Sequence, residues 1–352
     1  SPTDAGAVAA LGRQQRIDLV VVGPEAPLAA GVVDALRRAG IAVFGPDRAG
    51  AQLETSKSFA KEIMADAGVA TAASETFGEV NSAVEYLRSK PGPYVVKADG
   101  LAAGKGVLVT EDLPAAEDWV HHCIGGGFGE AGAQVVIEDF LDGPEVSVFA
   151  ICDGTRAIGL EPARDFKRLR DGDAGPNTGG MGCFSPVSDL PSDLVQHTLD
   201  EVVAPVLSSM ATRRIPYVGF LYTGFVLTAD GPKVLEFNCR LGDPETQVVL
   251  PRMESDLLGL LAAAANGDVG TTRVEWSPRA AVDVVLAAHG YPTDPRKGNV
   301  ITGVAEAAAL DDVLVFHAGT AREGRNLVTS GGRVLNVVGL GDTITEARSC
   351  LL

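Results

Sequence analysis

The sequence predicts a multidomain chain of mixed α/β and α+β class, with a parallel sheet in its N-terminal part and a β-rich C-terminal part. Its length of 352 residues suggests two or three domains. Hydrophobic residues make up 46% and charged residues 21%, an ordinary globular mixture that can bury a sizeable core. Runs rich in β-branched residues alternate with helical patterns in the first half, and short strand patterns dominate after Asn266.

The first elements indicate a parallel sheet. Residues 17–22 are mostly β-branched, residues 32–39 have a helical pattern, and residues 41–44 form the next strand pattern. A strand–helix–strand unit of this size pairs its strands in parallel and meets ligands at their carboxyl ends.

The middle of the chain predicts a second α/β segment. A helix with Ser56 as its N-cap and a stripe at Phe59, Ile63 and Ala67 opens this segment. The other expected elements are strands near 94–98, 107–110 and 134–138, and helices over 80–87, 115–123 and about 191–213. Between them, residues 164–183 are predicted to be a long, polar, glycine-rich loop.

Two more strands, 218–228 and 233–239, are joined by Asp230-Gly231-Pro232, which is typical of a hairpin. The strand patterns at 281–287 and 333–338 belong to the closing β-rich part.

Charge, hydropathy and cysteine content argue against some binding partners and some cellular locations. Lys plus Arg is 29 and Asp plus Glu is 46, so the formal net charge is −17, which argues against nucleic acid or an anionic membrane surface as the main partner. No apolar run approaches the roughly 18 residues of a membrane span. The five cysteines are scattered without a CxxC pair, which favours reduced thiols and a cytoplasmic location.

The sharpest chemical signal is KADGLAAGKGV at 97–107. Its glycines let backbone N–H groups approach phosphate oxygens, and Lys105 adds a cation. The spacing is not that of a Walker A loop. Because strands flank the segment, we expect a mobile flap over phosphates, and a plain hairpin remains the alternative.

The second signal is the strand end at 235–240. Side chains alternate along a strand, so three are expected in the core: Leu235, Phe237 and Cys239. Glu236, Asn238 and Arg240 then share the other face. The first two carry hard oxygen ligands suited to Mg²⁺, and the guanidinium can grip a carboxylate or phosphate. A solvated sheet face is the alternative, but asparagine is depleted in strands.

The third signal runs from Asp165-Phe166-Lys167-Arg168 to the glycine-rich stretch that ends at Gly182. Adjacent cations followed by a glycine-rich nest suit an anionic substrate. A surface Ω-loop has a similar composition, so both interpretations stay open.

Together and in this order, these segments closely resemble the glycinamide ribonucleotide synthetase family of the ATP-grasp superfamily, over nearly the whole chain. The segments that carry the resemblance are GPEAPL at 23–28, FGP at 44–46, QLETSKSFAK at 52–61, KADGLAAGKGV at 97–107, IEDFLDGPEVS at 137–147, DAGPNTGGMG at 173–182, EFNCRLGDPETQ at 236–247 and FHAGT at 316–320.

The resemblance implies an ATP-grasp fold and an ATP-dependent carbon–nitrogen ligase of de novo purine synthesis. The implied reaction joins glycine to 5-phosphoribosylamine through a glycyl phosphate and gives glycinamide ribonucleotide, ADP and phosphate. It implies ATP and Mg²⁺, with Mn²⁺ left open. The implied partners are these small molecules alone, and the implied state is a monomer.

The resemblance also implies roles for individual residues and three domains. The implied ATP-binding residues are Lys57, Lys97, Gly104, Lys105, Gly106, Glu138, Phe140, Leu141 and Glu145. Glu236 and Asn238 are the implied metal ligands, and Arg240 and Lys105 the implied catalytic groups. The implied substrate-binding residues are Pro24, Glu25, Asp165, Lys167, Asn177, Thr178, Arg240 and Asp243. The implied domains are the remnant of an N-terminal α/β domain at 1–58, an ATP-grasp domain at 59–265 with a mobile lid near 70–137, and a C-terminal domain at 266–352.

The sequence departs from the family pattern at its ends. Family members open with a GNGGREHA-like loop that helps to hold the phosphoribosyl group, and no such loop precedes Ile17. We therefore expect a truncated N-terminal domain and a short C-terminal end, with the ATP site retained. Two alternatives stay open. The first is another ATP-grasp enzyme, such as a carboxylase subunit or a phosphotransferase that stops at phosphorylation, and the second is a truncated ATP-binding module without activity.

Overall fold

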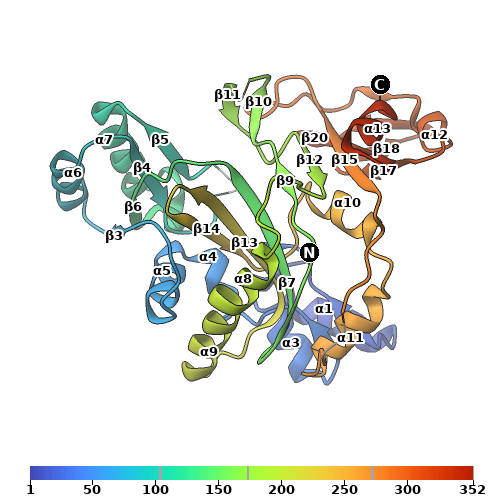
Figure 1. Cartoon of the computed structure of the whole chain (residues 1–352), viewed down its shortest axis with the longest axis horizontal. Helices are drawn as coiled ribbons and strands as arrows, with labels where there is room; N and C mark the ends of the chain where they lie inside the picture. Colours follow the sequence, from blue (N-terminus) through green and yellow to red (C-terminus); the bar gives the residue numbers. More distant parts are fainter. Residues whose placement is uncertain (103–104, 173, 271–272, 352) are drawn as a thin grey trace. The chain divides into compact units, whose positions relative to one another are not determined.

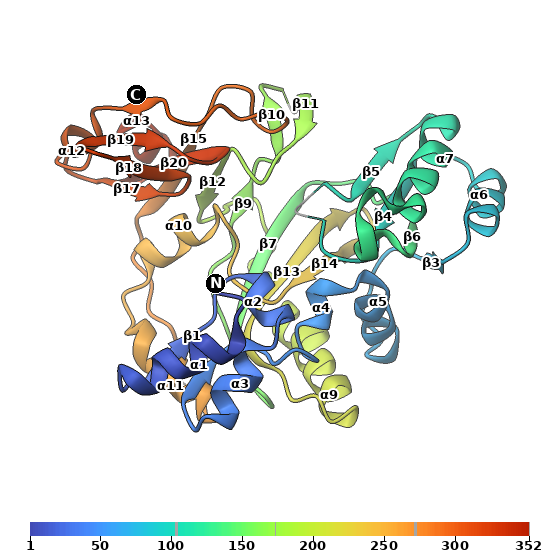
Figure 2. The same cartoon turned by 180° about the vertical axis from the view of Figure 1, so that it is seen from behind.

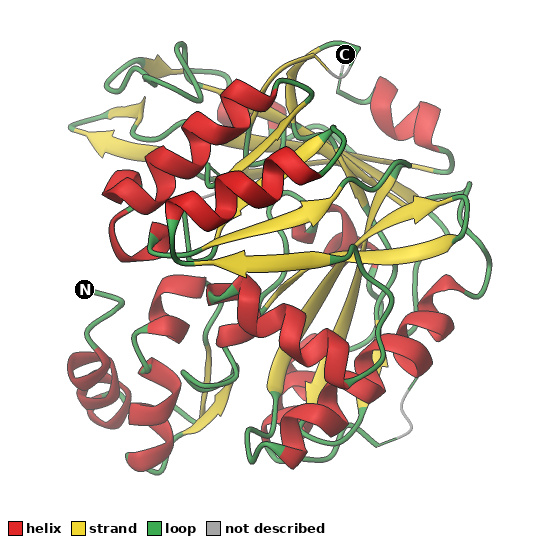
Figure 3. Ribbon diagram, turned by 90° about the vertical axis from the view of Figure 1, so that its left-hand side faces the viewer, coloured by secondary structure: helices red, strands yellow, loops and turns green. Residues whose placement is uncertain are grey.

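The computed structural model describes residues 1–102, 105–172, 174–270 and 273–351. It divides the chain into two compact units. Unit 1 comprises residues 1–159, 193–241 and 257–273, and unit 2 comprises residues 160–192, 242–256 and 274–352. Helices and strands both run through the molecule, in red and yellow in Figure 3, and so agree with the predicted mixed class.

Unit 1 begins with a small parallel α/β segment. Its elements are α1 (Ala5–Gln14), β1 (Leu19–Val21), α2 (Glu25–Ala29), α3 (Val32–Arg38) and β2 (Ala42–Phe44). β1 and β2 pair in parallel, with Leu19 opposite Ala42. The predicted strand–helix–strand unit is therefore confirmed, and α3 packs against α1 and β2, all in blue in Figure 2.

The second part of unit 1 is a four-stranded antiparallel sheet in the order β3-β6-β4-β5. Its elements are β3 (Ser74–Phe77), α6 (Val80–Ser89), β4 (Tyr94–Ala98), β5 (Val107–Thr110), α7 (Leu113–His122), the short helices η1 (Cys123–Gly127) and η2 (Gly129–Gly132), and β6 (Val135–Asp139). Leu87 of α6, Val120 of α7 and Val96 of β4 are fully buried in one core. Helices α6 and α7 therefore share a core with β4, and all three elements are teal in Figure 1.

The third part of unit 1 is the antiparallel sheet β14-β13-β7-β8 with its helices. Its strands are β7 (Glu145–Asp153), β8 (Ala157–Gly159), β13 (Val218–Thr228) and β14 (Gly231–Asn238). The helices of this part are α4 (Gln52–Thr55), α5 (Lys57–Asp66), α8 (Leu194–Thr198), η3 (Leu199–Val203), α9 (Ala204–Thr212) and α11 (Leu257–Ala265). Ser56 caps α5 as predicted, because its side chain accepts a hydrogen bond from the backbone N–H of Phe59.

Unit 2 is built on a five-stranded sheet in the order β17-β20-β15-β12-β9. The strands of unit 2 are β9 (Arg164–Asp165), β10 (Arg168–Arg170), β11 (Ala174–Asn177), β12 (Gly182–Ser185), β15 (Ala280–Ala287), β16 (Val300–Ile301), β17 (Val313–His317), β18 (Thr320–Glu323), β19 (Asn326–Thr329) and β20 (Arg333–Gly341). Its helices are α10 (Thr246–Val249), η4 (Leu250–Arg252), α12 (Val304–Ala307) and α13 (Ile344–Ser349). Within the described ranges, no helix has the length and apolar character needed to cross a membrane.

Two details of the sequence-based expectation were wrong. The stretch 164–183 contains three short strands and the start of β12, because Phe166 and Gly182 are joined by a backbone hydrogen bond of 3.0 Å and the flanking strands enter the sheet of unit 2. Leu235 is half-buried, whereas Val234 is completely buried. A register shift in the pairing of β14 with β13 breaks the alternation at this point.

Candidate functional site

A buried network of two lysines and one glutamate lies in unit 1. Lys97 on β4 and Glu138 on β6 are 4% and 6% exposed, although both carry charge. The Nζ atom of Lys97 lies 2.8 Å from Oε2 of Glu138, and that of Lys61 on α5 lies 3.4 Å from Oε1. The carboxylate is therefore shared by two cations.

Lys57 ties the start of α5 to the loop that follows β4. Its ammonium donates hydrogen bonds to the carbonyl oxygens of Ala98 at 2.8 Å and Gly100 at 3.2 Å. The carboxylate of Asp99 in turn accepts from the backbone N–H of Ser58 at 2.6 Å. Burial lowers the pKa of Lys57, while the nearby carboxylate of Glu236 acts in the opposite direction.

The predicted flap connects β4 with β5, as expected for a loop flanked by strands. Gly104 lies outside the described residues. Lys105 is exposed, whereas Gly106 is buried, and a Cβ atom on Gly106 would lie 2.6 Å from the Cβ of Ala102. Only glycine therefore fits at position 106 without a shift of its neighbours.

The predicted adenine hinge is the connection from β6 to β7. After Glu138, the side chain of Phe140 is 43% exposed, Leu141 is half-buried, and Glu145 is an exposed residue at the start of β7. An exposed aromatic side chain, Phe140, therefore follows two residues after Glu138 of the buried network.

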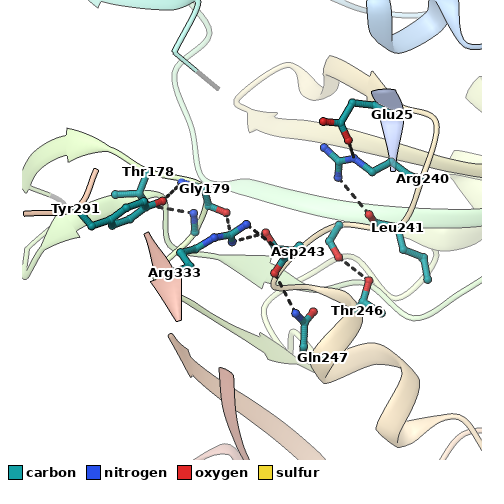
Figure 4. Close-up of polar contacts among 12 residues, drawn as sticks. Glu25, Thr178, Gly179, Arg240, Leu241, Asp243, Thr246, Gln247, Tyr291 and Arg333 are labelled. Atoms are coloured by element: carbon teal, nitrogen blue, oxygen red, sulfur yellow. Dashed lines mark hydrogen bonds and ion pairs between the residues drawn. The ribbon is translucent and has the colours of Figure 1, made fainter. Parts of the chain in front are cut away.

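Arg240, just after β14, is the centre of a second charged group. Its Nη2 atom lies 3.2 Å from Oε1 of Glu54 and 3.4 Å from Oδ1 of Asn238, and its Nε atom lies 3.4 Å from Oε2 of Glu25. Glu25 is in α2, directly after Pro24, the N-cap residue of that helix. Figure 4 shows Glu25 reaching the guanidinium.

Glu54 on α4 is the buried member of this group. Its side chain is 6% exposed, and Oε2 accepts a hydrogen bond of 2.7 Å from the backbone N–H of Cys239. Burial raises the pKa of Glu54, and the neighbouring charges of Glu25 and Glu236 raise it further, whereas Arg240 lowers it. Arg240 is thus held by several acidic groups.

Glu236 and Asn238 have a donor set that fits a divalent metal ion. Both are half-buried and lie two residues apart on β14, so their side chains share a face. A carboxylate and an amide oxygen are ligands that Mg²⁺ accepts, with phosphate and water oxygens completing its shell. The described part of the chain contains no group of three or more His, Cys, Asp or Glu side chains arranged to hold a metal.

The glycine-rich segment of unit 2 is closed by its own hydrogen bonds. The backbone N–H and the hydroxyl of Thr178 both donate to the carbonyl oxygen of Lys167, at 2.7 and 2.8 Å. Asp165 pairs with Cys183 across β9 and β12, and Asn177 is exposed. The structure therefore places all four predicted residues of this segment within unit 2.

Arg333, the first residue of β20, joins this segment to the loop before α10. Its Nη1 atom donates to the carbonyl oxygens of Gly179 at 2.5 Å and Asp243 at 2.6 Å, and Nη2 lies 2.9 Å from Oδ2 of Asp243. The hydroxyl of Tyr291 accepts from the N–H of Gly179 at 2.9 Å, and Oδ1 of Asp243 accepts from Nε2 of Gln247 at the same distance. Figure 4 shows these contacts converging on Arg333 and Asp243.

A buried carboxyl group lies on the same sheet. Asp283 on β15 is 2% exposed, and neither of its oxygens has a hydrogen-bond partner among the described residues. Burial and the charge of Asp243 raise its pKa to about 8, against the opposing effect of Arg333. Asp283 is therefore protonated in the folded chain at neutral pH.

This carboxyl group predicts a pH-dependent stability. Unfolding returns the pKa of Asp283 from about 8 to roughly 3.9. Between these values the folded chain retains a proton that the unfolded chain has lost, so stability falls as pH rises through this window and levels off above it. We expect Asp283→Asn to flatten that slope and to raise the free energy of unfolding at pH 7 by about 2 kcal/mol.

Urea unfolding at a series of pH values measures this effect. Asp342→Asn, which changes a side chain that is 88% exposed, is the control and should leave the slope as it is. Parallel curves for the parent and Asp283→Asn would contradict the assignment.

Sequence reasoning missed four residues that the structure places in these groups: Glu54, Lys61, Tyr291 and Arg333. The first two lie inside QLETSKSFAK at 52–61, so that segment pointed to them. The other two lie far along the chain from the residues they hold, and no local pattern indicates such contacts.

Comparison with known proteins identifies the family. The N, ATP-grasp (A) and C domains of phosphoribosylglycinamide synthetase match residues 1–54, 55–246 and 281–351. Phosphoribosylamine–glycine ligase of Brucella melitensis is 48% identical over 346 residues, which cover 98% of this chain and 81% of the relative. The enzyme of that name from Streptomyces coelicolor is 51% identical over 348 residues, 98% of this chain and 82% of the relative.

Solved structures agree. The crystal structure of phosphoribosylamine–glycine ligase from Thermotoga maritima has a TM-score of 0.80 at 40% identity and covers 87% of this chain and 76% of that chain. The crystal structure of a biotin carboxylase–β-γ-ATP complex from Campylobacter jejuni has a TM-score of 0.77 at 16% identity, over 99% of this chain and 76% of that one, which supports the fold alone. The predicted ATP-grasp fold is confirmed, and the chain belongs to the phosphoribosylglycinamide synthetase family.

Proposed function

We propose that the chain is an ATP-dependent carbon–nitrogen ligase that joins glycine to 5-phosphoribosylamine and produces glycinamide ribonucleotide, ADP and phosphate. The observation that carries this proposal is the set of charged groups in unit 1. Glu236 and Asn238 lie at the end of β14, Arg240 follows that strand, and Lys97 lies in a buried network. Relatives named for this reaction match 98% of the chain, which favours an active ligase over an inactive ATP-binding module.

The reaction needs an activated carboxylate. At neutral pH a carboxylate and an amine form a salt, so the glycine carboxylate first attacks the γ-phosphate of ATP and gives glycyl phosphate and ADP. The amine of phosphoribosylamine then attacks the acyl carbon, and phosphate leaves. Two anions meet in the first step, so cations must stabilise the charge on the transferring group.

The nucleotide is assigned to unit 1. We propose that Lys57 and Lys97 contact phosphate, and that the loop with Gly104, Lys105 and Gly106 covers it. The hinge after β6 would meet adenine through Glu138, Phe140 and Leu141, and Glu145 would accept the ribose hydroxyls. Burial lowers the pKa of Lys57 because few water molecules can solvate its positive charge. A bound anionic ligand would supply a negative counter-charge and so stabilise the charged form.

A divalent metal ion accompanies ATP in this proposal, with Glu236 and Asn238 as its protein ligands. When bound, it offsets the charge of the phosphate oxygens and acts as a Lewis acid at the transferring group. Mg²⁺ is the ion that we propose, and Mn²⁺ is the alternative. Arg240 would steady the phosphoryl group or the acyl phosphate, because a guanidinium can donate two parallel hydrogen bonds to its oxygens.

The two co-substrates are assigned to other segments. Asp165, Lys167, Asn177, Thr178 and Asp243 of unit 2 are proposed to line the glycine and amine sites. Pro24 and Glu25 are proposed at the end of β1, where the carboxyl end of a parallel strand favours ligand binding.

Phosphate release tests the reaction. It is measured with ATP and Mg²⁺ alone, after glycine is added, and after phosphoribosylamine is generated in the same cuvette. Release that needs both co-substrates supports the ligase. Release with glycine alone would instead indicate an enzyme that stops at phosphorylation, and bound ATP without any release would indicate the inactive module. Replacing Mg²⁺ by Mn²⁺ in the first assay ranks the two metals.

Arg333 gives a prediction for the co-substrate side. Its three hydrogen bonds to Gly179 and Asp243 hold two segments assigned to glycine and the amine. We expect Arg333→Met to raise the KM for glycine and for phosphoribosylamine by about 10–100-fold, because charge-assisted hydrogen bonds are each worth about 1.5–3 kcal/mol. The KM for ATP should stay near that of the parent.

Steady-state kinetics with each substrate varied in turn measure this split. Arg322→Met, which changes an exposed residue of β18, is the matched control. Equal changes in all three KM values would contradict a role confined to the co-substrates.

A further inference from the structure

Glu138 has one negative charge and two lysine partners. Oε2 lies 2.8 Å from Nζ of Lys97, and Oε1 lies 3.4 Å from Nζ of Lys61. The exposed side-chain fractions are 3% for Glu138, 5% for Lys97 and 11% for Lys61. Two cations and one anion leave this group with a net charge of about +1 in a site with little water.

Lys61 is fixed on its other side as well. Its ammonium donates to Oγ1 of Thr71 at 2.9 Å and to the carbonyl oxygen of Ala72 at 3.2 Å. The hydroxyl of Thr71 donates to the carbonyl oxygen of Val234 on β14 at 2.6 Å. Lys61 therefore links α5 and β6 to the strand that carries Glu236 and Asn238.

The two lysines use separate oxygens of Glu138. With Lys61 on Oε1, the carboxylate presents Oε2 to Lys97, whose ammonium also donates to the carbonyl oxygen of Leu235 at 3.5 Å. Without Lys61, Glu138 and Lys97 would form a neutral one-to-one pair, and the carboxylate would be free to turn. The excess positive charge would then be lost.

We propose that Lys61 is a positioning residue for nucleotide binding, which acts through Glu138 to hold the Lys97 ammonium and its excess positive charge toward an anionic nucleotide. The inference rests on the proposed ATP site and adds a residue that the family resemblance did not single out. Burial lowers the pKa of Lys61, and the carboxylate of Glu138 counters that effect. The ion pair thus offsets part of the cost of burying the second lysine.

Lys61→Met tests the proposal because it keeps the length of the side chain and removes its charge. Binding of ATP with Mg²⁺ to the full chain is measured by titration calorimetry, so the readout does not depend on ligase activity. We expect the Kd for ATP to rise about tenfold or more, since a buried charged hydrogen bond is worth about 1.5–3 kcal/mol. Lys61→Arg should restore at least part of the affinity, and the KM for glycine should not change.

A second lysine–carboxylate pair provides a matched control, because its carboxylate, Asp139, lies on β6 next to Glu138. Lys90 lies 3.3 Å from Asp139, the residue after Glu138, but these side chains are 36% and 54% exposed. Lys90→Met therefore removes a lysine–carboxylate pair of similar length from the surface, and it should leave the Kd for ATP within about twofold, because exposed pairs contribute little.

A double-mutant cycle separates positioning from stability. If Lys61 acts through Glu138, then adding Lys61→Met to Glu138→Gln should change the Kd for ATP much less than Lys61→Met changes it in the parent. Thermal unfolding of each variant shows that the fold is kept.

Three outcomes would overturn the proposal. They are parent-like ATP affinity in folded Lys61→Met, additive effects in the cycle, and an equal loss in Lys90→Met. A parent chain that binds ATP but releases no phosphate would count against the proposed ligase reaction and not against the role of Lys61.

Discussion

A chain with Glu236→Ala and Asn238→Ala is expected to lose metal-dependent turnover by at least about a thousandfold while it keeps its fold. Both side chains are half-buried on one face of β14, and neither is in the fully buried core of the sheet. Their removal takes away the two proposed protein ligands of the metal, so the phosphoryl transfer loses its main counter-charge.

Phosphate release at saturating co-substrates measures this loss, with circular dichroism as the check on folding. Asp230→Asn is the matched control, because this carboxylate is 87% exposed in the turn before β14. Turnover within about tenfold of the parent in the double variant would rule out the metal assignment.

Arg240→Met is expected to lower kcat by about 100–1,000-fold. The guanidinium lies within 3.4 Å of atoms of Glu25, Glu54 and Asn238. These contacts orient it just after the strand that carries the two proposed metal ligands, where we propose that it meets the transferring group. Arg240→Lys should recover only part of the rate, because an ammonium keeps the charge but not the planar pair of donors.

Arg240→Met should also change the pKa of Glu54. Arg240 lowers the pKa of this buried carboxyl group, so the pKa should rise further in Arg240→Met. The fall in kcat on acidification should therefore begin at a higher pH in Arg240→Met than in the parent, as a kcat–pH profile would show.

Arg213 provides the matched control for this prediction. It too contacts two carboxylates, those of Glu62 and Asp66, but on an exposed surface. Arg213→Met should keep the kcat of the parent. A similar loss of kcat in both variants would mean that Arg240 has only a structural role.

Local hydrophobic patterns predicted most of the elements of unit 1. Strands 94–98, 107–110 and 218–228 have the predicted bounds, because each is a run of mostly apolar residues between turn residues. Strands β9 and β10 were missed because they are short and rich in arginine, and β11 was missed because it contains a glycine and a proline. None of the three has the apolar run that predicts a strand. The bulge near Leu235 depends on the pairing with β13, which the sequence of one strand does not contain.

Local sequence patterns also predicted only part of the candidate site. The alternation in β14 predicted that Glu236, Asn238 and Arg240 share a face. Glu54, by contrast, meets Arg240 across a long stretch of chain, and Arg333 meets Gly179 across 154 positions. Such contacts form only when the chain takes up its tertiary structure, so a local sequence pattern does not predict them. The division into three domains at 1–58, 59–265 and 266–352 stays a prediction.

The interleaving of the two compact units has an evolutionary consequence. The chain passes from one unit to the other five times, after residues 159, 192, 241, 256 and 273. Domains that are continuous in sequence can be exchanged between genes by a single recombination event. Unit 2 lies in three separate segments, so one crossover cannot replace it as a whole. A change of function carried by unit 2 would therefore have to arise mainly by point substitutions in place, and a laboratory chimera would need all three segments to be exchanged together.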